Sequence, residues 1–292
     1  MECMLCPRHC HIDREQALGF CGLDHHAKIA KVMLHRWEEP CLTQENGSGA
    51  IFFSGCQLKC IFCQNHDISK KAVGRNVTSD ELYEIFHTLK EQGASNINLV
   101  SPTPHLSVII PAIEKAKKEG FSLPFVYNTS GYETVETISH LAGLIDIFLP
   151  DAKFASNELS KELASAYHYP EISLMAIRAM YRLTGPLQWE NKRLTRGVIV
   201  RHLVLPSLYR DSLQVLENLA ENLPADGFIL SVMRQYTPTS YVSQHPFLNR
   251  KVTTLEYEKV VEKAKEIGFQ WVYAQGKDSA DSKYVPDFNC ND

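Results

Sequence analysis

The chain has 292 residues, 44% hydrophobic and 22% charged, with a formal net charge of −4, which suits one large or two small domains with a buried core. The balanced charge supplies no strong attraction to nucleic acid or anionic membrane, and no run approaches the roughly 18 apolar residues of a membrane span. The N-terminal sequence is too polar and too rich in cysteine for a signal peptide, so we expect a cytoplasmic protein.

Residues 1–49 show no alternation of strand and helix patterns, and we expect an irregular extension stapled by a metal. All nine cysteines except Cys290 lie in the first 63 residues, and in a reducing compartment such thiols favour metal binding over disulfides. The N-terminal set is Cys3, Cys6, Cys10 and Cys21. Its spacing suits a structural zinc site or an auxiliary iron–sulfur cluster, and non-ligating thiols are the third interpretation. The histidines near enough in sequence to replace one thiol are His9, His11, His25 and His26.

From about residue 50 onward, short apolar runs alternate with longer helical patterns. The runs predict strands at residues 50–55, 96–100, 123–128, 144–150, 197–206, 227–233 and 269–275. Amphipathic patterns predict helices at residues 79–92, 106–120, 157–183, 211–222 and 254–267. This alternation indicates a parallel sheet of right-handed βα units, and about six units are too few to close a TIM barrel. We therefore predict an α/β protein with an open partial barrel at residues 50–276 and a C-terminal tail at 277–292.

A spaced cysteine motif directly follows the first predicted strand: Cys56, Cys60 and Cys63. Three thiolates from one short loop can converge on three corners of a cubane iron–sulfur cluster and leave one iron open to another ligand. A structural zinc ion instead needs four protein ligands. A zinc loop and unrelated buried thiols are the alternative interpretations.

The motif, with Phe62 just before its third cysteine, resembles the radical S-adenosylmethionine (SAM) superfamily. The segments HRWEEP, GSGAIFFSGCQLKCIFCQN, INLVSPTPH, YNTSGYE, IDIFLPDAKF, VIVRHLVLP and MRQYTP resemble, over nearly the whole chain, the pyruvate formate-lyase activating enzyme-like group. This resemblance implies a partial (β/α)6 TIM-like barrel with a [4Fe–4S] cluster on Cys56, Cys60 and Cys63. It also implies that SAM chelates the open iron, that an electron from the cluster breaks its S–C5′ bond, and that the resulting 5′-deoxyadenosyl radical abstracts a substrate hydrogen.

The resemblance also implies which residues contact SAM. Phe62 is expected near the adenine. Ser101 and Thr103 stand where the superfamily has a Gly-Gly-Glu-Pro stretch, and their hydroxyls can accept a hydrogen bond from the methionyl ammonium without supplying a charge. The ribose-contacting segment corresponds to Asn128, Thr129, Ser130 and Gly131. The other implied contacts are Asp151, Lys153, Arg201 and Gln235, of which the lysine suits the SAM carboxylate.

The activity implied by the resemblance is that of a radical SAM oxidoreductase that installs a radical on a glycine of a partner enzyme. A flavodoxin- or ferredoxin-type protein would then be the electron donor. Because the Gly-Gly-Glu sequence is missing and the N-terminal cysteines are added, radical modification of another peptide or of a small molecule is the alternative. A non-catalytic iron–sulfur or zinc protein is the alternative of another class. The absence of a basic aromatic patch argues against a nucleic-acid partner, and we expect no membrane partner.

Several other residues allow both a structural and a functional interpretation. Glu38 and Glu39 precede a predicted turn, and a solvated surface pair is favoured over a role at the site. His105 and His202 border the carboxyl ends of predicted strands. At this location a structural role and a functional role are equally favoured for each histidine. Cys41 and Cys290 are expected to have no chemical role.

Overall fold

The computed structural model describes residues 2–43, 46–280 and 288. Its strands are β1 Ala27–His35, β2 Ser48–Phe53, β3 Arg75–Val77, β4 Ile97–Val100, β5 Phe125–Thr129, β6 Ile147–Pro150, β7 Gln188–Glu190, β8 Arg193–Leu203, β9 Ile229–Met233 and β10 Val272–Ala274. Its α-helices are α1 His66–Lys71, α2 Ser79–Glu91, α3 Leu106–Lys118, α4 Val135–Ser139, α5 Asn157–Ala164, α6 Tyr169–Thr184, α7 Tyr209–Asn222 and α8 Thr254–Ile267. None of these helices has the length and apolar composition to cross a membrane.

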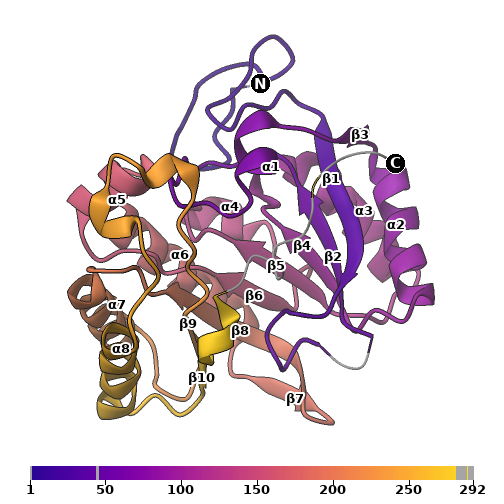
Figure 1. The fold of residues 1–292 in the computed structure, drawn as a ribbon. Coiled ribbons are helices and arrows are strands. Elements are labelled where there is room, and N and C mark those ends of the chain that lie inside the picture. The colour runs from indigo at the N-terminus through magenta and orange to yellow at the C-terminus, as the bar shows by residue number, and fades with distance from the viewer. Residues whose placement is uncertain (1, 44–45, 281–287, 289–292) are drawn as a thin grey trace.

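One twisted sheet has the strand order β10-β9-β8-β6-β5-β4-β2-β1-β3, with β7 paired to β8 at the side. From β2 to β10 all neighbouring strands are parallel, and helices connect them on the outer side of the sheet (Figure 1). Within the described residues, β10 and β3 are the two edges of the sheet. The predicted open partial barrel of about six βα units is therefore confirmed.

Local sequence signals set the boundaries of the outer helices. Thr78 forms a capping box with Glu81 at the start of α2, and Thr253 forms the equivalent box with Glu256 at the start of α8. Gly268 follows α8 with a φ of +88°, the left-handed conformation that ends many helices. These helices therefore begin and end close to where the sequence predicts.

The predicted helix 157–183 is wrong as one element, because the structure divides it into α5 and α6. Ser165 and His168 both have left-handed φ angles, 51° and 53°, which interrupt the helical hydrogen-bond ladder. Pro170 then stands in the first turn of α6, where its missing N–H is tolerated. The amphipathic pattern runs through the break because both helices pack on the same core.

The segment 1–49 contains β1, which the sequence does not predict. β1 pairs antiparallel with β2, from Ile29 opposite Phe53 to His35 opposite Ser48, so this part of the segment continues the sheet. Residues 2–26 form the irregular loops at the top of the molecule in Figure 1. Of the predicted tail 277–292, the structure describes residues 277–280 and 288, and Cys290 lies outside the described residues.

The chain between β1 and β2 closes the amino-terminal end of the partial barrel. The amide of Leu194 donates to the carbonyl oxygen of Cys41 at 3.1 Å, and the side-chain amide of Asn96 donates to that of Leu42 at 2.7 Å. An apolar layer results, made of Cys41, Leu42, Val126, Ile147, Leu149, Leu194, Ile199 and Ile229. This layer is the floor of the barrel, and the space above it opens toward the carboxyl ends of the strands.

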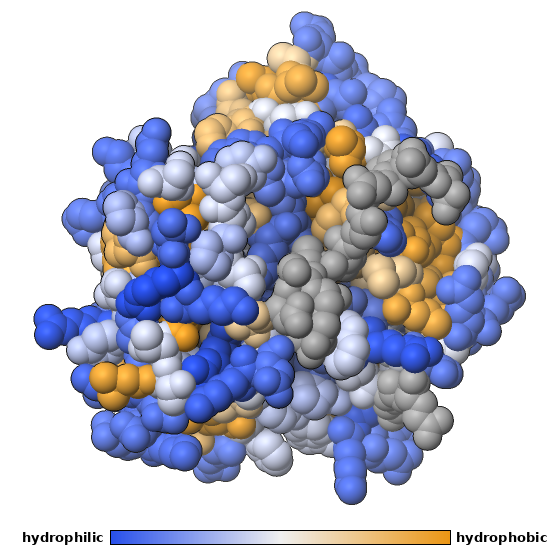
Figure 2. All heavy atoms as spheres, viewed as in Figure 1, coloured by the Kyte–Doolittle hydropathy of each residue, from blue (hydrophilic) through white to orange (hydrophobic). Residues whose placement is uncertain are grey.

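Hydrophilic side chains cover most of the face seen in Figure 2, and apolar side chains gather there in separate groups. One such group lies at the top, over the N-terminal loops. The large hydrophobic residues exposed in these loops are Met4, Leu18 and Phe20. The N-terminal segment therefore buries its apolar side chains less completely than the sheet and its helices do.

Candidate active site

A cavity of about 750 Å³ lies above this apolar floor, within the usual size range of small-molecule sites. Side chains alternate along a strand, so the residue two positions beyond an inward-facing one also points inward. Along β5, β8 and β9 the inward residues change from apolar at the floor to polar at the cavity wall, where they are Asn128, Arg201 and Ser231. The sheet therefore presents polar groups at the carboxyl ends of its strands, where parallel α/β folds bind ligands.

The loop from Cys56 to Cys63 connects β2 with α1. Its backbone is fixed by α5, since the amides of Lys59 and Ile61 donate to the carbonyl oxygens of Ala164 and Leu163 at 3.0 and 2.9 Å. Burial raises the pKa of the Cys56 thiol to about 11, so this thiol stays protonated unless a cation displaces the proton.

The three sulfurs of the motif are not gathered around one point. At least two of them lie more than 4.8 Å apart, since Cys56, Cys60 and Cys63 do not meet that mutual distance. Ligands of one tetrahedral zinc ion, with Zn–S bonds of about 2.3 Å, lie roughly 3.8 Å apart. Thiolates of a cubane bind different iron atoms and stand farther apart. These sulfurs are therefore not arranged as the ligands of one tetrahedral ion.

A network of largely buried charges lies beside this loop at the wall of the cavity. The Arg201 guanidinium donates to Asp151 at 3.0 Å and to the side-chain oxygen Oδ1 of Asn128 at 2.6 Å, and lies 3.6 Å from a Glu38 side-chain oxygen. The Lys153 ammonium donates to the other Asp151 oxygen at 2.6 Å. Burial acts to raise the pKa of Asp151, but Lys153 and Arg201 outweigh it and hold this pKa below its usual value. The carboxylate is therefore ionised, and both cations are oriented.

A second buried network surrounds Glu133, which is 1% exposed. Its Oε1 accepts hydrogen bonds from Gln57 at 2.7 Å, from Thr103 at 2.9 Å and from the Thr129 hydroxyl. The Tyr127 hydroxyl adds a bond to Thr103 at 2.9 Å. Burial, which outweighs these hydrogen bonds, raises the pKa of Glu133 to about 7. The network fixes Gln57, and with it the cysteine loop, against the ends of β4 and β5.

Replacing Glu133 with glutamine is expected to change how stability depends on pH. A folded-state pKa raised from 4.5 to about 7 means that the stabilisation of the neutral carboxyl is complete below about pH 4.5 and is lost as the pH rises through 7. The glutamine amide stays neutral and keeps an acceptor oxygen. In urea unfolding, the free energy of unfolding of Glu133→Gln should therefore rise relative to that of the wild type between about pH 5 and about pH 8. The exposed Glu136→Gln is the control, and parallel profiles for the wild type and Glu133→Gln would refute the expectation.

The structure brings some of the expected SAM contacts to the cavity and buries others elsewhere. Asn128, Arg201 and Gln235 line the cavity, and Asp151 and Lys153 join Arg201 in the charged network. The hydroxyls of Thr103 and Thr129 instead bond within the Glu133 network. Which of these residues contact SAM stays a prediction.

Three further expected contacts lie in the loops after β2, β4 and β5. Phe62 is 6% exposed and packs edge-to-face on Phe154, with ring centroids 6.0 Å apart. Ser101 has a φ of 60°, a left-handed conformation that favours glycine. The buried hydroxyl of Ser130 has no hydrogen-bond partner among the described residues, which leaves it free to bind a ligand. That unpaired hydroxyl fits the ribose-binding role implied by the resemblance.

Gly131 has a φ of 75°, and a Cβ there would overlap the carbonyl oxygen of Asp151. We expect Gly131→Ala to destabilise the protein by several times the ~1 kcal/mol that a left-handed alanine costs, and to displace Asp151. Gly120→Ala is the matched control, because Gly120 has a φ of 80° with nothing within 4 Å of a Cβ. Equal urea midpoints for the two variants would contradict the expectation.

The sequence alone does not reveal the positions of several of these residues. Glu38 and Glu39, favoured as a surface pair, both line the cavity, and Glu39 is 8% exposed. Burial and the neighbouring Glu38 raise the pKa of Glu39 to about 7. No spacing signal identifies Glu133 or Gln57, because their network joins the ends of separate strands.

His105 and His202 have structural partners. The His105 ring bonds to the carbonyl oxygen of Ser54 at 2.8 Å, and the His202 ring bonds to that of Ala152 at 2.6 Å. Both rings are buried, and burial lowers the pKa of each to about 4, so both are neutral. Each ring therefore has one structural partner, and Nε2 of His202 is buried with no hydrogen-bond partner among the described residues, so a functional role of His202 stays open.

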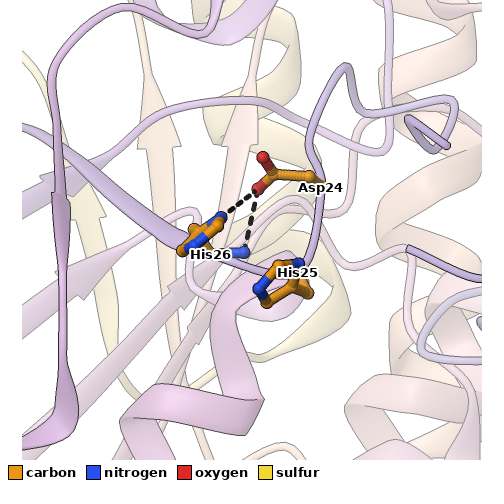
Figure 3. Close-up of side chains that lie close together, drawn as sticks. All are labelled: Asp24, His25 and His26. Atoms are coloured by element: carbon orange, nitrogen blue, oxygen red, sulfur yellow. Dashed lines mark hydrogen bonds and ion pairs between the residues drawn. The ribbon is translucent and has the colours of Figure 1, made fainter. Parts of the chain in front are cut away.

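The four N-terminal thiols line one small cavity beside the cysteine loop. Residues 2–43 include all four nearby histidines, and none of them lines that cavity. His25 and His26 instead lie beside Asp24, the one group of described residues whose potential metal ligands all come within 4.8 Å of one another (Figure 3). The Asp24 carboxylate accepts from the His26 amide at 2.9 Å, and both imidazoles are exposed, so we interpret this group as a surface turn.

Comparison with known proteins assigns the fold. Residues 50–233 match the radical SAM superfamily. An uncharacterized protein of Methanocaldococcus jannaschii is 31% identical over 282 residues, covering 93% of this chain and 77% of that protein.

Solved structures agree with this assignment. SuiB of Streptococcus suis, crystallised with S-adenosylmethionine, has a TM-score of 0.53 and 14% identity over 76% of this chain and 48% of its own. The hydrogenase maturase HydG of Carboxydothermus hydrogenoformans has a TM-score of 0.51 and 13% identity over 79% of this chain and 54% of its own. The chain spans about half the length of both, and at these identities the likeness shows the fold alone.

The open parallel barrel, with a three-cysteine loop after its first parallel strand, defines a class of enzymes that use SAM and an iron–sulfur cluster. The chain belongs to the radical SAM superfamily, and membership implies SAM-derived radical chemistry at a [4Fe–4S] cluster.

Proposed function

We propose that Cys56, Cys60 and Cys63 hold a [4Fe–4S] cluster and that SAM binds between this cluster and the cavity of the barrel. When bound, the reduced cluster supplies the electron that breaks the S–C5′ bond of SAM, so that a 5′-deoxyadenosyl radical can take a hydrogen from the substrate. The observation that carries the proposal is the buried charged network of Asp151, Lys153 and Arg201 between the cysteine loop and the cavity.

The chain's own residues have distinct tasks in this reaction. Lys153 offers an oriented ammonium suited to the SAM carboxylate, because Asp151 holds it at 2.6 Å. The unpaired Ser130 hydroxyl is available to the ribose. The apolar floor below the cavity excludes water from that side, which protects a radical from quenching.

For the substrate we propose a glycine of a partner protein, activated by removal of one α-hydrogen. The cavity of about 750 Å³ can take a small cofactor together with a single residue of a substrate, and a glycine is the smallest residue that a partner protein can insert. We further propose a flavodoxin- or ferredoxin-type electron donor and a cytoplasmic location, since free thiolates and an open-iron cluster need a reducing environment.

Another peptide or a small molecule is the second candidate, favoured by the two carboxylates Glu38 and Glu39 at the cavity wall. These side chains suit a substrate that carries a cationic group, whereas a backbone glycine has none. A purely structural or electron-carrying protein has less support, because a four-cysteine site is the usual design for a carrier.

Deuterium transfer tests the proposed substrate. Reduced enzyme and SAM are incubated anaerobically with proteins from cells grown on α-deuterated glycine, and the mass of the 5′-deoxyadenosine is measured by mass spectrometry. Deuterium in the product, together with a glycyl radical signal in electron paramagnetic resonance (EPR), is expected. Undeuterated product with no glycyl signal would overturn the glycine substrate and leave the second candidate. Proteins labelled with deuterated leucine serve as the control.

We propose that Cys3, Cys6, Cys10 and Cys21 form a second metal site of the same enzyme. The support is their arrangement around one cavity, which borders the loop of the first site through Gln57.

A further inference from the structure

We infer that the second site holds a [4Fe–4S] cluster rather than zinc. We also infer that the charge of this cluster shifts the reduction potential of the cluster in the barrel. The inference deepens the proposed function, since it concerns a second cofactor of the same enzyme. Iron content at the N-terminal thiols can nevertheless be measured without any SAM cleavage, so the two proposals can fail separately.

The cavity at these thiols is built to receive an anion. Arg14 is 9% exposed, and its Nη1 donates to the carbonyl oxygen of Pro104 at 2.7 Å. Its Nε and Nη2 are buried and have no hydrogen-bond partner among the described residues, as is also true of Arg8 Nη2. Both guanidinium groups line the cavity together with the four thiols.

Buried guanidinium N–H groups without an acceptor are costly to maintain. Four thiolates around a dipositive metal or around a cubane cluster carry a net negative charge that would pair with them. Arg14 already interacts electrostatically with Cys21. The unpaired donors therefore indicate that a thiolate-ligated metal group belongs in this cavity.

The sulfurs are not arranged as the ligands of one zinc ion. Four thiolates on one zinc ion lie roughly 3.8 Å apart, given Zn–S bonds of about 2.3 Å. In every set of three chosen from Cys3, Cys6, Cys10 and Cys21, all of them described, at least two sulfurs lie more than 4.8 Å apart. The cysteines of the barrel motif show the same spread. Because each thiolate of a cubane binds its own iron atom, the wider spacing suits a second cluster.

The two cysteine sites lie against each other. Arg8 Nε donates to the carbonyl oxygen of Gln57 at 2.9 Å, and Gln57 stands inside the barrel motif. A Cβ at Gly55, the residue before Cys56, would lie 2.9 Å from the carbonyl oxygen of Cys21. Lys59 interacts electrostatically with both Cys56 and Cys21. A change of charge at one site therefore changes the electrostatic potential at the other.

This proximity has a predictable sign. A negatively charged N-terminal cluster opposes the addition of an electron to its neighbour, so it lowers the reduction potential of the barrel cluster. Removal of the N-terminal cluster should raise that potential. Raising the ionic strength should change this potential less than it would for two exposed charges, because Cys60 is buried and the four N-terminal thiols are half-buried.

Metal content and EPR test the inference on the full chain, purified without oxygen and reconstituted with iron, sulfide and zinc. The variants are Cys56→Ser/Cys60→Ser/Cys63→Ser, which removes the barrel site, and Cys6→Ser/Cys21→Ser, which removes the N-terminal one. The wild type should hold about eight iron atoms per chain and each variant about four. Cys41→Ser is the matched control and should keep about eight.

Added SAM separates the two clusters. The reduced Cys6→Ser/Cys21→Ser variant should show an EPR signal that changes with SAM and a higher midpoint potential than the wild type. The EPR signal of the triple variant should not change when SAM is added, because all its iron atoms have protein ligands. About four iron atoms and about one zinc in the wild type would overturn the inference, whether or not the variants fold. If the SAM response failed while the triple variant kept its iron, the proposed function would fall and the second cluster would stand.

Discussion

Cys60→Ala is expected to lower 5′-deoxyadenosine formation to the background measured without reductant. Cys60 is 9% exposed and lies in the middle of the motif, where its thiol belongs to the buried wall of the site. Loss of one of three thiolates leaves a cubane with two protein ligands, which the remaining loop cannot retain. The measurement is product formation with SAM and dithionite, together with iron bound at the barrel site.

The control for this prediction is Cys41→Ala. Cys41 is also buried, at 3% exposure, but it packs in the apolar floor of the barrel, away from the motif. Its loss should cost some stability and leave product formation unchanged. A Cys60→Ala enzyme that still released reductant-dependent 5′-deoxyadenosine would show that the motif does not hold the reactive cluster.

Arg201→Gln is expected to destabilise the folded protein by about 3–5 kcal/mol, the cost of breaking a buried ion pair from one side. Asp151 and Glu38 keep side-chain exposures of only 14% and 11%, so removing the guanidinium leaves two carboxylates buried and close together. Urea unfolding at neutral pH measures the change. SAM binding should weaken as well. Without Arg201, Lys153 is the one cation left to pair with Asp151 in this network, so its ammonium is less available to the SAM carboxylate.

Arg75→Gln is the matched control for Arg201. Arg75 pairs with Glu81 at 3.7 Å on the surface, where the two side chains are 59% and 52% exposed. Exposed pairs of this kind contribute about 0–1 kcal/mol. Similar losses of stability in the two variants would contradict the view that the Arg201 network is a buried structural and binding element.

The sheet was predictable because each parallel strand is covered on both faces and therefore reads as an apolar run. Residues 96–100 and 227–233 correspond closely to β4 and β9, both fully or nearly fully buried. The break between α5 and α6 was not predictable, because Ser165 and His168 adopt left-handed conformations that their residue types seldom require. Strand β1 was not predicted for another reason. It is an antiparallel strand beside the edge strand β3, and its two lysines and its terminal histidine interrupt the apolar run that marks a strand covered on both faces.

The site was predictable only where chemistry is concentrated in a short segment. The motif Cys56–Cys63 needs no tertiary information, because its three thiols come from one loop. Glu133 and Arg14 are different. Each acquires its role by meeting residues more than forty positions away, Gln57 for the glutamate and Pro104 for the arginine. Glu39 looked like a surface residue because nothing in its local sequence reveals that the chain between β1 and β2 enters the barrel.

The central claim is that this chain reductively cleaves SAM at an open-iron cluster. The most direct test is to load the wild type with iron and sulfide under anaerobic conditions, reduce it, add SAM and quantify 5′-deoxyadenosine and methionine. Equal amounts of both, formed only with reductant, are the predicted result. A fully loaded, reduced protein that binds SAM and forms neither product would contradict the account.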